Sequence, residues 1–108
     1  YWRQFILSCQ RVRADCDDLY RHLSTIPGLR AYKPDANFIF CYLNDDAMSG
    51  PELARKLFTY HNILIKHCAG KTMPQAYRYV RIASRTMPEN HKLVYALRSI
   101  LTKDTAIL

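Results

Sequence analysis

The chain has 108 residues, of which 49% are hydrophobic, and a formal net charge of +7 at pH 7. This length allows one compact domain, and this apolar content excludes a disordered chain. The charge is compatible with nucleic acid, an anionic small molecule or an acidic partner, but the basic residues form no run of five or six. No apolar run approaches the ~20 residues of a membrane span. No export signal opens the sequence, so we expect a cytoplasmic chain without a membrane segment.

The first expected element is a helix over residues 1–24. Apolar residues recur there at alternate spacings of three and four, which is the period of one helix face. They are Trp2, Phe5, Cys9, Val12, Cys16, Leu19 and Leu23. The pattern is already present at Trp2, and no Ser, Thr, Asp or Asn precedes it to cap a helix. We therefore expect that the native helix begins before Tyr1 and that residues 1–24 are a truncated linking helix.

Four strands are expected after the break at Pro27-Gly28, because aromatic and β-branched residues gather in four short segments. These segments are residues 29–32, 36–43, 63–69 and 77–84. Both faces of 36–43 are largely apolar, which predicts a central strand covered on both sides. A turn at Pro34-Asp35, a loop over 44–50 and a frayed tail after Lys103 complete these expectations.

Two further helices are predicted by capping boxes, "SGPE" at 49–52 and "TMPE" at 86–89. In each, a hydroxyl can cap the helix, proline lies in the first turn and glutamate stands three residues after the cap. The first of these helices should end near His61-Asn62. The expected core residues are Leu53, Ala54, Leu57 and Phe58 in the first helix, and Leu93, Val94, Leu97, Ile100 and Leu101 in the second. The order α-β-β-α-β-β-α predicts a single small α/β domain with helices packed on a mainly antiparallel or mixed sheet.

The sequence carries no pattern typical of a catalytic or metal centre. HExxH, GxSxG, GxGxxG and the phosphate loop are absent, and three glycines are too few for a glycine-built phosphate cradle. The four cysteines form no CxxC pair and are expected to be buried, reduced thiols. They are Cys9, Cys16, Cys41 and Cys68. The four histidines share no helical spacing and are expected to be solvent-facing or structural.

The last predicted strand carries the clearest binding candidate. Arg81 lies in mid-strand between Val80 and Ile82, where a charge needs a partner. A guanidinium matches a carboxylate or a phosphate with two parallel hydrogen bonds. Lys66 lies in the middle of the preceding strand candidate, so one anion could bridge both residues if the two strands pair. The alternatives are that Arg81 pairs with an internal acidic residue or lies on an open sheet face.

Three segments add a family resemblance: "PGLRAYKPDANFIF", "ELARKLFTYHNILIKHCA" and "RYVRIASRTMPENHKLVYAL". In order and spacing they resemble the C-terminal small domain of fold-type-I aminotransferases that depend on pyridoxal phosphate (PLP). The nearest branch is that of histidinol-phosphate aminotransferase and threonine-phosphate decarboxylase, and the resemblance covers most of the chain.

The resemblance implies roles for four residues. Arg81 stands where the family anchors the substrate's carboxylate or phosphate. Lys66 stands where a basic residue, more often arginine, contacts a substrate phosphate. Asn37 matches the asparagine of the family's "ANF" segment, which lies close to the active site. Arg85 replaces the usual glycine and is either a further anion contact or a departure without a role.

The resemblance also implies what the chain lacks. The family's PLP-binding lysine belongs to a large domain that would precede Tyr1. Residues 1–108 are thus expected to be a C-terminal small domain without a catalytic residue, a metal or bound PLP, and inactive alone. The full-length enzyme would be a PLP-dependent homodimer acting on an amino acid or an amino-acid phosphate.

Two other interpretations stay open. A non-catalytic regulatory or dimerisation domain could use the helix from Trp2 to Leu23 as its interface. A basic nucleic-acid-binding α/β module is suggested by the net charge and by the sheet aromatics Phe38, Tyr42 and Tyr79. The glycine-aromatic spacing typical of RNA-binding sheets is absent, which makes nucleic acid an unlikely partner.

Overall fold

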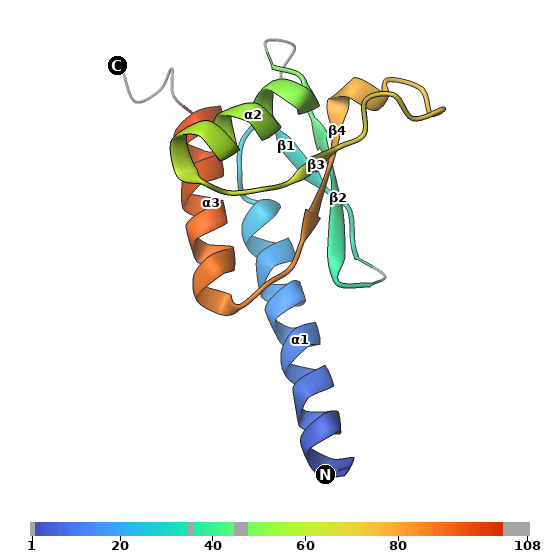
Figure 1. The fold of residues 1–108 in the computed structure, drawn as a ribbon, viewed down its shortest axis with the longest axis vertical. Coiled ribbons are helices and arrows are strands. Elements are labelled where there is room, and N and C mark those ends of the chain that lie inside the picture. The colour runs from blue at the N-terminus through green and yellow to red at the C-terminus, as the bar shows by residue number, and fades with distance from the viewer. Residues whose placement is uncertain (1, 35, 45–47, 103–108) are drawn as a thin grey trace.

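A computed structural model describes residues 2–34, 36–44 and 48–102, and their helices and strands follow the predicted order. The helices are α1 (Trp2–Leu23), α2 (Gly50–His61) and α3 (Met87–Leu101), and the strands are β1 (Leu29–Ala31), β2 (Phe38–Leu43), β3 (Lys66–His67) and β4 (Tyr79–Ala83), with a 3-10 turn, η1 (Ala76–Arg78), before β4. The strands form one antiparallel sheet in the order β1-β2-β4-β3, and the three helices lie on one side of it (Figure 1). This confirms the predicted α/β class. Asp35 of the predicted turn, residues 45–47 of the predicted loop and the tail from Lys103 lie outside the described residues.

The predicted hydroxyl caps are present at the starts of α2 and α3. The Glu52 backbone N–H donates to the Ser49 hydroxyl oxygen at 3.3 Å, and the Glu89 N–H donates to Thr86 Oγ1 at 3.4 Å. These hydroxyls satisfy backbone donors that a helix start leaves without partners. Helix α2 ends at Asn62, whose left-handed backbone turns the chain back toward the sheet. In the part of the chain that the structure describes, no helix combines the length and the apolarity needed to cross a membrane.

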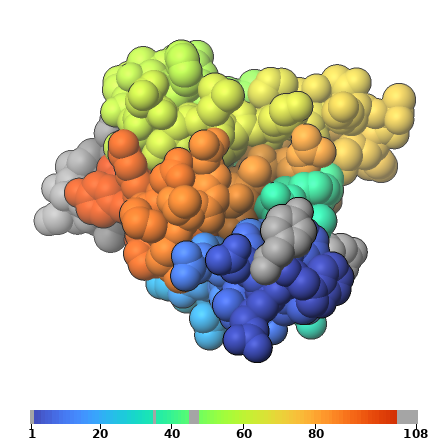
Figure 2. All heavy atoms as spheres, turned by 60° about the horizontal axis from the view of Figure 1, so that its bottom comes forward, coloured from blue at the N-terminus to red at the C-terminus, as the bar shows by residue number. Residues whose placement is uncertain are grey.

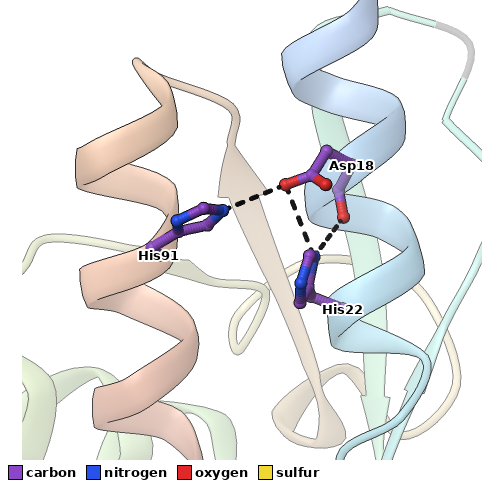
Figure 3. Close-up of side chains that lie close together, drawn as sticks. All are labelled: Asp18, His22 and His91. Atoms are coloured by element: carbon purple, nitrogen blue, oxygen red, sulfur yellow. Dashed lines mark hydrogen bonds and ion pairs between the residues drawn. The ribbon is translucent and has the colours of Figure 1, made fainter.

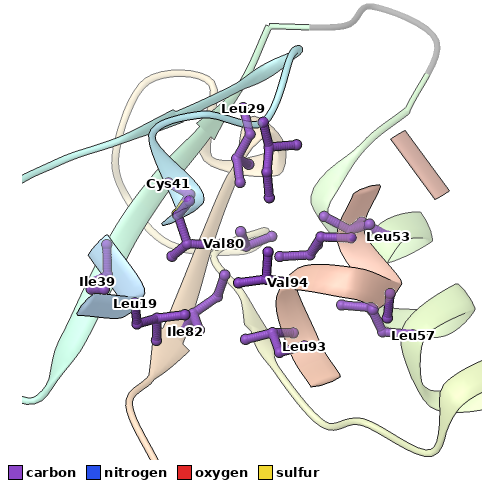
Figure 4. Packing of buried hydrophobic residues seen from close by; sticks show 14 of the residues in the cluster. Leu19, Leu29, Ile39, Cys41, Leu53, Leu57, Val80, Ile82, Leu93 and Val94 are labelled. Atoms are coloured by element: carbon purple, nitrogen blue, oxygen red, sulfur yellow. The ribbon is translucent and has the colours of Figure 1, made fainter. Parts of the chain in front are cut away.

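One hydrophobic core fills the space between the three helices and the inner face of the sheet (Figure 4). Its fully buried members include Leu19 and Leu23 of α1, Leu53 and Leu57 of α2, Leu97 of α3, Ile39, Cys41 and Leu43 of β2, and Val80 and Ile82 of β4. Ile100 and Leu101 are half-buried and pack against this core. The prediction of Phe58 as a core residue is wrong, because its side chain is exposed on the outer side of α2.

Strand β2 has the predicted central position but not the predicted burial. It pairs with β1 on one edge and with β4 on the other. Ile39 and its alternate neighbours are buried, whereas Phe38 and Tyr42 are half-buried and Phe40 is exposed. All three helices cover the same face, so the expectation that β2 is covered on both sides is wrong for the described residues. The result is an open sheet face that carries aromatic side chains.

The strand predicted over 63–69 is much shorter than expected. Only Lys66 and His67 pair with β4, at the edge of the sheet. Ile63 and Ile65, which made the segment resemble a strand, are half-buried and pack against the core from the connection that follows α2. Apolar residues in that segment thus serve packing rather than strand pairing. The predicted last strand likewise loses its first residues to η1.

The predicted apolar face of α1 is buried only in its C-terminal half. Cys16, Leu19 and Leu23 are buried, whereas Trp2 is 70% exposed. Phe5, Cys9 and Val12 are exposed as well. The reason is that the N-terminal half of α1 extends beyond the sheet and the other helices, and in Figure 2 its dark blue residues stand in front of the domain. The prediction that all four cysteines are buried therefore fails at Cys9 and holds for the other three.

Candidate functional site

The open face of the sheet carries a row of aromatic rings interleaved with cations. Alternation along β2 and β4 places Phe38, Tyr42, Tyr79 and Arg81 on this face, opposite the buried side chains. The rings of Tyr42 and Tyr79 meet edge to face, with centroids 5.2 Å apart. The Cζ atom of Arg81 lies 4.9 Å from the centre of the Phe38 ring. An aromatic neighbour supports a guanidinium without using its in-plane donors, so these donors stay available to an anion.

Lys66 and Arg81 are direct partners across the β3–β4 pairing. Side chains at such positions have Cβ atoms about 4.5–5.5 Å apart, and like charges there repel each other. In the described ranges neither residue has an ion pair with an acidic side chain. Of the possibilities left by the sequence, Arg81 thus lies on an open sheet face beside a second cation. This pair is the arrangement that an oxyanion would stabilise.

A pocket of about 330 Å³ lies beside this pair. Its lining residues are Phe40, Lys66, His67, Cys68, Lys71, Thr72, Met73 and Arg81. The volume falls at the lower end of the range typical of small-molecule sites. Lys71 adds a third cation that the sequence did not single out, because it comes from the connection after β3 and not from a strand. The chain turns back there at Gly70, whose φ of +90° favours glycine.

Asn37 does not line this pocket. Its carbonyl oxygen accepts the Ser84 N–H at 2.7 Å, just before the β2–β4 pairing begins. Its side chain is exposed and lines a separate groove of about 620 Å³, which α1 forms together with Lys33, Pro34, Ala36 and Asn37. Asn37 is three residues from Phe40 along the chain, or about 10 Å in an extended strand. It is therefore near the Arg81 pocket but belongs to a different concave surface.

Arg85 lies beyond the end of β4 and already has an acidic partner. Its Nε atom is 3.0 Å from Glu89 Oε2, and its side chain is 69% exposed. The Thr86 hydroxyl donates to Glu89 Oε1 at 2.8 Å. This hydrogen bond and the Arg85 charge hold the pKa of the Glu89 carboxyl below its usual range. The structure thus brings Arg81 and Lys66 together, and it places Asn37 and Arg85 elsewhere.

Asn90 is a buried residue that the sequence analysis did not identify. Its amide oxygen accepts the Arg85 N–H at 2.8 Å, and its amide nitrogen donates to Ser84 Oγ and to the Arg85 carbonyl, each at 3.2 Å. A weaker contact at 3.4 Å reaches the Asp15 carbonyl on α1. These contacts hold the junction between β4 and α3, so Asn90 positions the C-terminal end of the strand that carries Arg81.

The described residues do not by themselves fit PLP. The cofactor needs a lysine whose amine is desolvated and acidic or polar groups that hold the pyridine ring. Among the described residues no lysine and no carboxylate is buried, and Asn90 is the one buried polar side chain. The described residues offer anion-binding groups at a sheet surface and no site of their own for the cofactor.

No model of a known protein family matches the chain, but comparisons with curated proteins find several relatives. A CMP-5'-(3-aminopropyl)phosphonate synthase from Streptomyces rubellomurinus is 40% identical over 99 residues, which are 92% of this chain and 16% of that protein. A threonine-phosphate decarboxylase from Salmonella typhimurium is 34% identical over 83 residues, or 77% of this chain and 21% of that protein. A histidinol-phosphate aminotransferase from Methanosphaera stadtmanae is 23% identical over 94 residues, which are 87% of this chain and 25% of that protein.

Solved structures agree with these relatives in fold. A decarboxylase from Sulfurospirillum multivorans superposes with a TM-score of 0.85 at 24% identity and covers 93% of this chain and 28% of that one. The histidinol-phosphate aminotransferase from Clostridium acetobutylicum gives a TM-score of 0.77, also at 24% identity, over 87% of this chain and 27% of that one. The chain is homologous to a part of the fold-type-I pyridoxal-phosphate enzymes. The resemblance stated from the sequence is thereby confirmed, and the chain spans a quarter or less of the length of the curated relatives described above.

Proposed function

We propose that residues 1–108 form the C-terminal small domain of a PLP-dependent aminotransferase or a related decarboxylase, and that Arg81 and Lys66 hold the acid group of its substrate. The observation that carries this proposal is the direct cross-strand pairing of two cations on an open sheet face beside a pocket. Neither cation has an acidic partner within the described residues. A bound oxyanion would relieve their repulsion and supply both with a partner.

The substrate class that this arrangement favours is an amino acid or amine precursor with a phosphate or phosphonate group. Two relatives are named for a phosphate ester and a third for a phosphonate. A dianion matches two positive charges better than a carboxylate does, and Lys71 lies at the same pocket. Arg81 would bind two oxygens through its planar fork, and Lys66 would act as a point charge beside it.

The domain's contribution is positioning rather than bond chemistry. PLP, when bound in the full-length enzyme, supplies the electron sink, and the described residues supply the anchor for the acid group. By fixing that group, Arg81 would decide which end of the substrate faces the rest of the active site. Asn37 would line the substrate cleft from the adjoining groove, and Arg85 would join only after it leaves Glu89. The isolated chain is accordingly expected to be inactive. The full-length enzyme is expected to be a cytoplasmic homodimer.

The test uses the full-length polypeptide that carries this chain. Arg81→Ala should lower kcat/KM by about tenfold to a few hundredfold, because a charge-assisted contact contributes about 1.5–3 kcal/mol. Arg81→Lys should recover only part of this loss, since a lysine cannot form the two-bond contact. Lys66→Ala should weaken the binding of phosphorylated substrates more than the binding of their unphosphorylated counterparts. Arg55→Ala, which removes an exposed cation from α2, is the matched control. Wild-type kcat/KM in Arg81→Ala would refute the proposed anchor.

A second candidate, binding of single-stranded nucleic acid, is favoured by the same aromatic face. Bases stack on exposed rings, and cations follow the backbone. Phe38, Tyr42 and Tyr79 with Arg81 provide both kinds of group. Fluorescence anisotropy of the 108-residue chain with a labelled oligonucleotide distinguishes the candidates. Salt-dependent binding that Tyr42→Ala weakens would support nucleic acid, and no binding at low salt would exclude it.

A further inference from the structure

Two histidines and one aspartate from different helices meet between α1 and α3. Asp18 and His22 are four residues apart on α1, and His91 lies near the start of α3, which packs beside it. Asp18 Oδ2 is 3.4 Å from His22 Nδ1 and 3.3 Å from His91 Nε2 (Figure 3). One ligand-type atom from each of the three residues lies within 4.8 Å of the other two. No local sequence pattern predicts this cluster, because His22 and His91 are far apart along the chain.

These separations match the edges of a tetrahedral metal site. With bonds of about 2.0–2.1 Å between zinc and imidazole nitrogen or carboxylate oxygen, neighbouring ligand atoms lie about 3.3–3.4 Å apart. Two such edges are already present around Asp18 Oδ2. Both imidazoles lie beside the same carboxylate oxygen. One metal ion placed there could take a ligand atom from each of the three side chains.

We propose that Asp18, His22 and His91 bind one divalent transition-metal ion, with Zn²⁺ as the best match. Two imidazoles and one carboxylate are typical of zinc and its neighbours, whereas Mg²⁺ and Ca²⁺ require mostly oxygen ligands. Water or another group would complete the fourth position. Arg21 Nη2 lies 3.7 Å from the other carboxylate oxygen and would hold it as an outer partner. His22 Nδ1 also contacts the Asp18 carbonyl oxygen at 2.8 Å, so metal binding must displace this contact or use the other ring nitrogen.

The position of the site indicates a structural role. It lies in the helical layer, whereas Arg81 lies on the opposite, open face of the sheet. A metal at this point would cross-link α1 to α3 in the packed C-terminal half of α1, next to the half that projects from the domain (Figure 1). It would therefore fix the direction in which the projecting helix leaves the domain and would stabilise the folded chain by mass action.

The experiment is zinc titration of the metal-stripped 108-residue chain, in a Cys9→Ser background that removes the exposed thiol. ZnCl₂ alone should bind one-to-one by calorimetry and raise the thermal unfolding midpoint, and MgCl₂ should do neither. Asp18→Asn and His91→Gln should each raise the Kd for zinc by at least about tenfold, since even outer-shell changes cost that much. The matched control His61→Gln removes a half-buried histidine outside the cluster and should leave the Kd unchanged.

A second measurement covers the case in which a variant fails to fold. Paramagnetic Ni²⁺ added to the unsubstituted chain should broaden the NMR signals of His22 and His91 before those of His61 and His67. Saturable zinc binding with this pattern supports the site. The proposal would be overturned if zinc did not bind or if the Kd for zinc were unchanged in both cluster variants. Broadening of all four histidines together by Ni²⁺ would also overturn it.

Discussion

Replacement of Asn90 by alanine tests whether one buried amide holds the junction between β4 and α3. The Asn90 side chain is 1% exposed and is surrounded by polar backbone groups. It accepts one hydrogen bond from the Arg85 N–H and donates to the Ser84 hydroxyl and the Arg85 carbonyl, with a longer contact to the Asp15 carbonyl. Alanine would leave these groups without a partner in a site from which water is largely excluded.

The expected loss follows from these contacts. A hydrogen bond contributes about 0.5–1.5 kcal/mol net, and an abandoned buried partner costs about 1–3 kcal/mol. Three bonds of 3.2 Å or shorter therefore predict a loss of about 2–4 kcal/mol for Asn90→Ala. In a domain of this size each kcal/mol lowers the thermal midpoint by about 4–8 °C, so the midpoint should fall by roughly 10 °C or more.

Urea unfolding of the 108-residue chain, followed by circular dichroism, measures this loss. Lys92→Ala is the control, because it removes an exposed side chain from the same helix and should change stability by less than about 0.5 kcal/mol. Ser84→Ala, which removes one of the three partners, should give an intermediate loss. If Asn90→Ala costs less than about 1 kcal/mol, the amide is not the anchor inferred here.

Gly50→Ala should lower stability by about 1–3 kcal/mol in urea unfolding. The reason is that an added Cβ would lie 3.0 Å from two backbone carbonyl oxygens, one in η1 and one in β4. Unchanged stability would contradict this packing. The pKa of Glu89 is lowered chiefly by the Thr86 hydroxyl, so this carboxylate stabilises the fold above its ordinary pKa and ceases to do so as pH falls through the lowered value. The midpoint difference between wild type and Glu89→Gln should thus shrink from pH 7 to pH 3, and a constant difference would refute the linkage. Burial raises the pKa of the Cys41 thiol to about 12, whereas Cys9 is exposed. Alkylation of the folded chain, followed by mass spectrometry, should therefore modify Cys9 first. Equal labelling of both cysteines would show that Cys41 is accessible.

The helix boundaries were predictable because their signals are local. A Ser or Thr cap, a proline and a glutamate within four residues specify a helix start whatever packs against it, and α2 and α3 begin there. Strand limits follow tertiary pairing instead. Residues 63–69 have the composition of a strand, but their place at the sheet edge leaves only Lys66–His67 paired. Composition alone does not show where a partner strand ends.

Burial was harder to predict, because apolar composition does not show what covers a side chain. The two apolar faces of β2 suggested two covering layers, and the described residues supply one. The apolar pattern of α1 is continuous, but burial stops near Cys16, where the helix leaves the domain. Asn90 is the reverse case, because no sequence pattern singled it out although its polar side chain is buried. Its burial depends on the return of α3 against α1, a contact between distant segments.

The site was predictable in part. Strand alternation alone predicts that Arg81 lies on the other face of β4 from Val80 and Ile82. The structure agrees, because Val80 and Ile82 are buried and Arg81 is not. The pairing of Arg81 with Lys66 depends on the register between β3 and β4, which no local pattern sets. Lys71 depends on the path of the connection after β3. Sequence reasoning therefore identified two of the three cations at the pocket and could not establish that they meet.

The Lys66–Arg81 pair also separates stability from function. Two like charges at directly opposed strand positions are unfavourable, whereas opposite charges there contribute about 0.2–1 kcal/mol. Lys66→Glu should therefore stabilise the isolated chain slightly in urea unfolding. Under the proposed function, the same substitution should abolish phosphate recognition in the full-length enzyme. A residue that lowers the stability of its own sheet calls for a functional reason. If Lys66→Glu destabilised the chain and left phosphate recognition intact, Lys66 would be a structural residue, and Arg81 would bind the acid group without it.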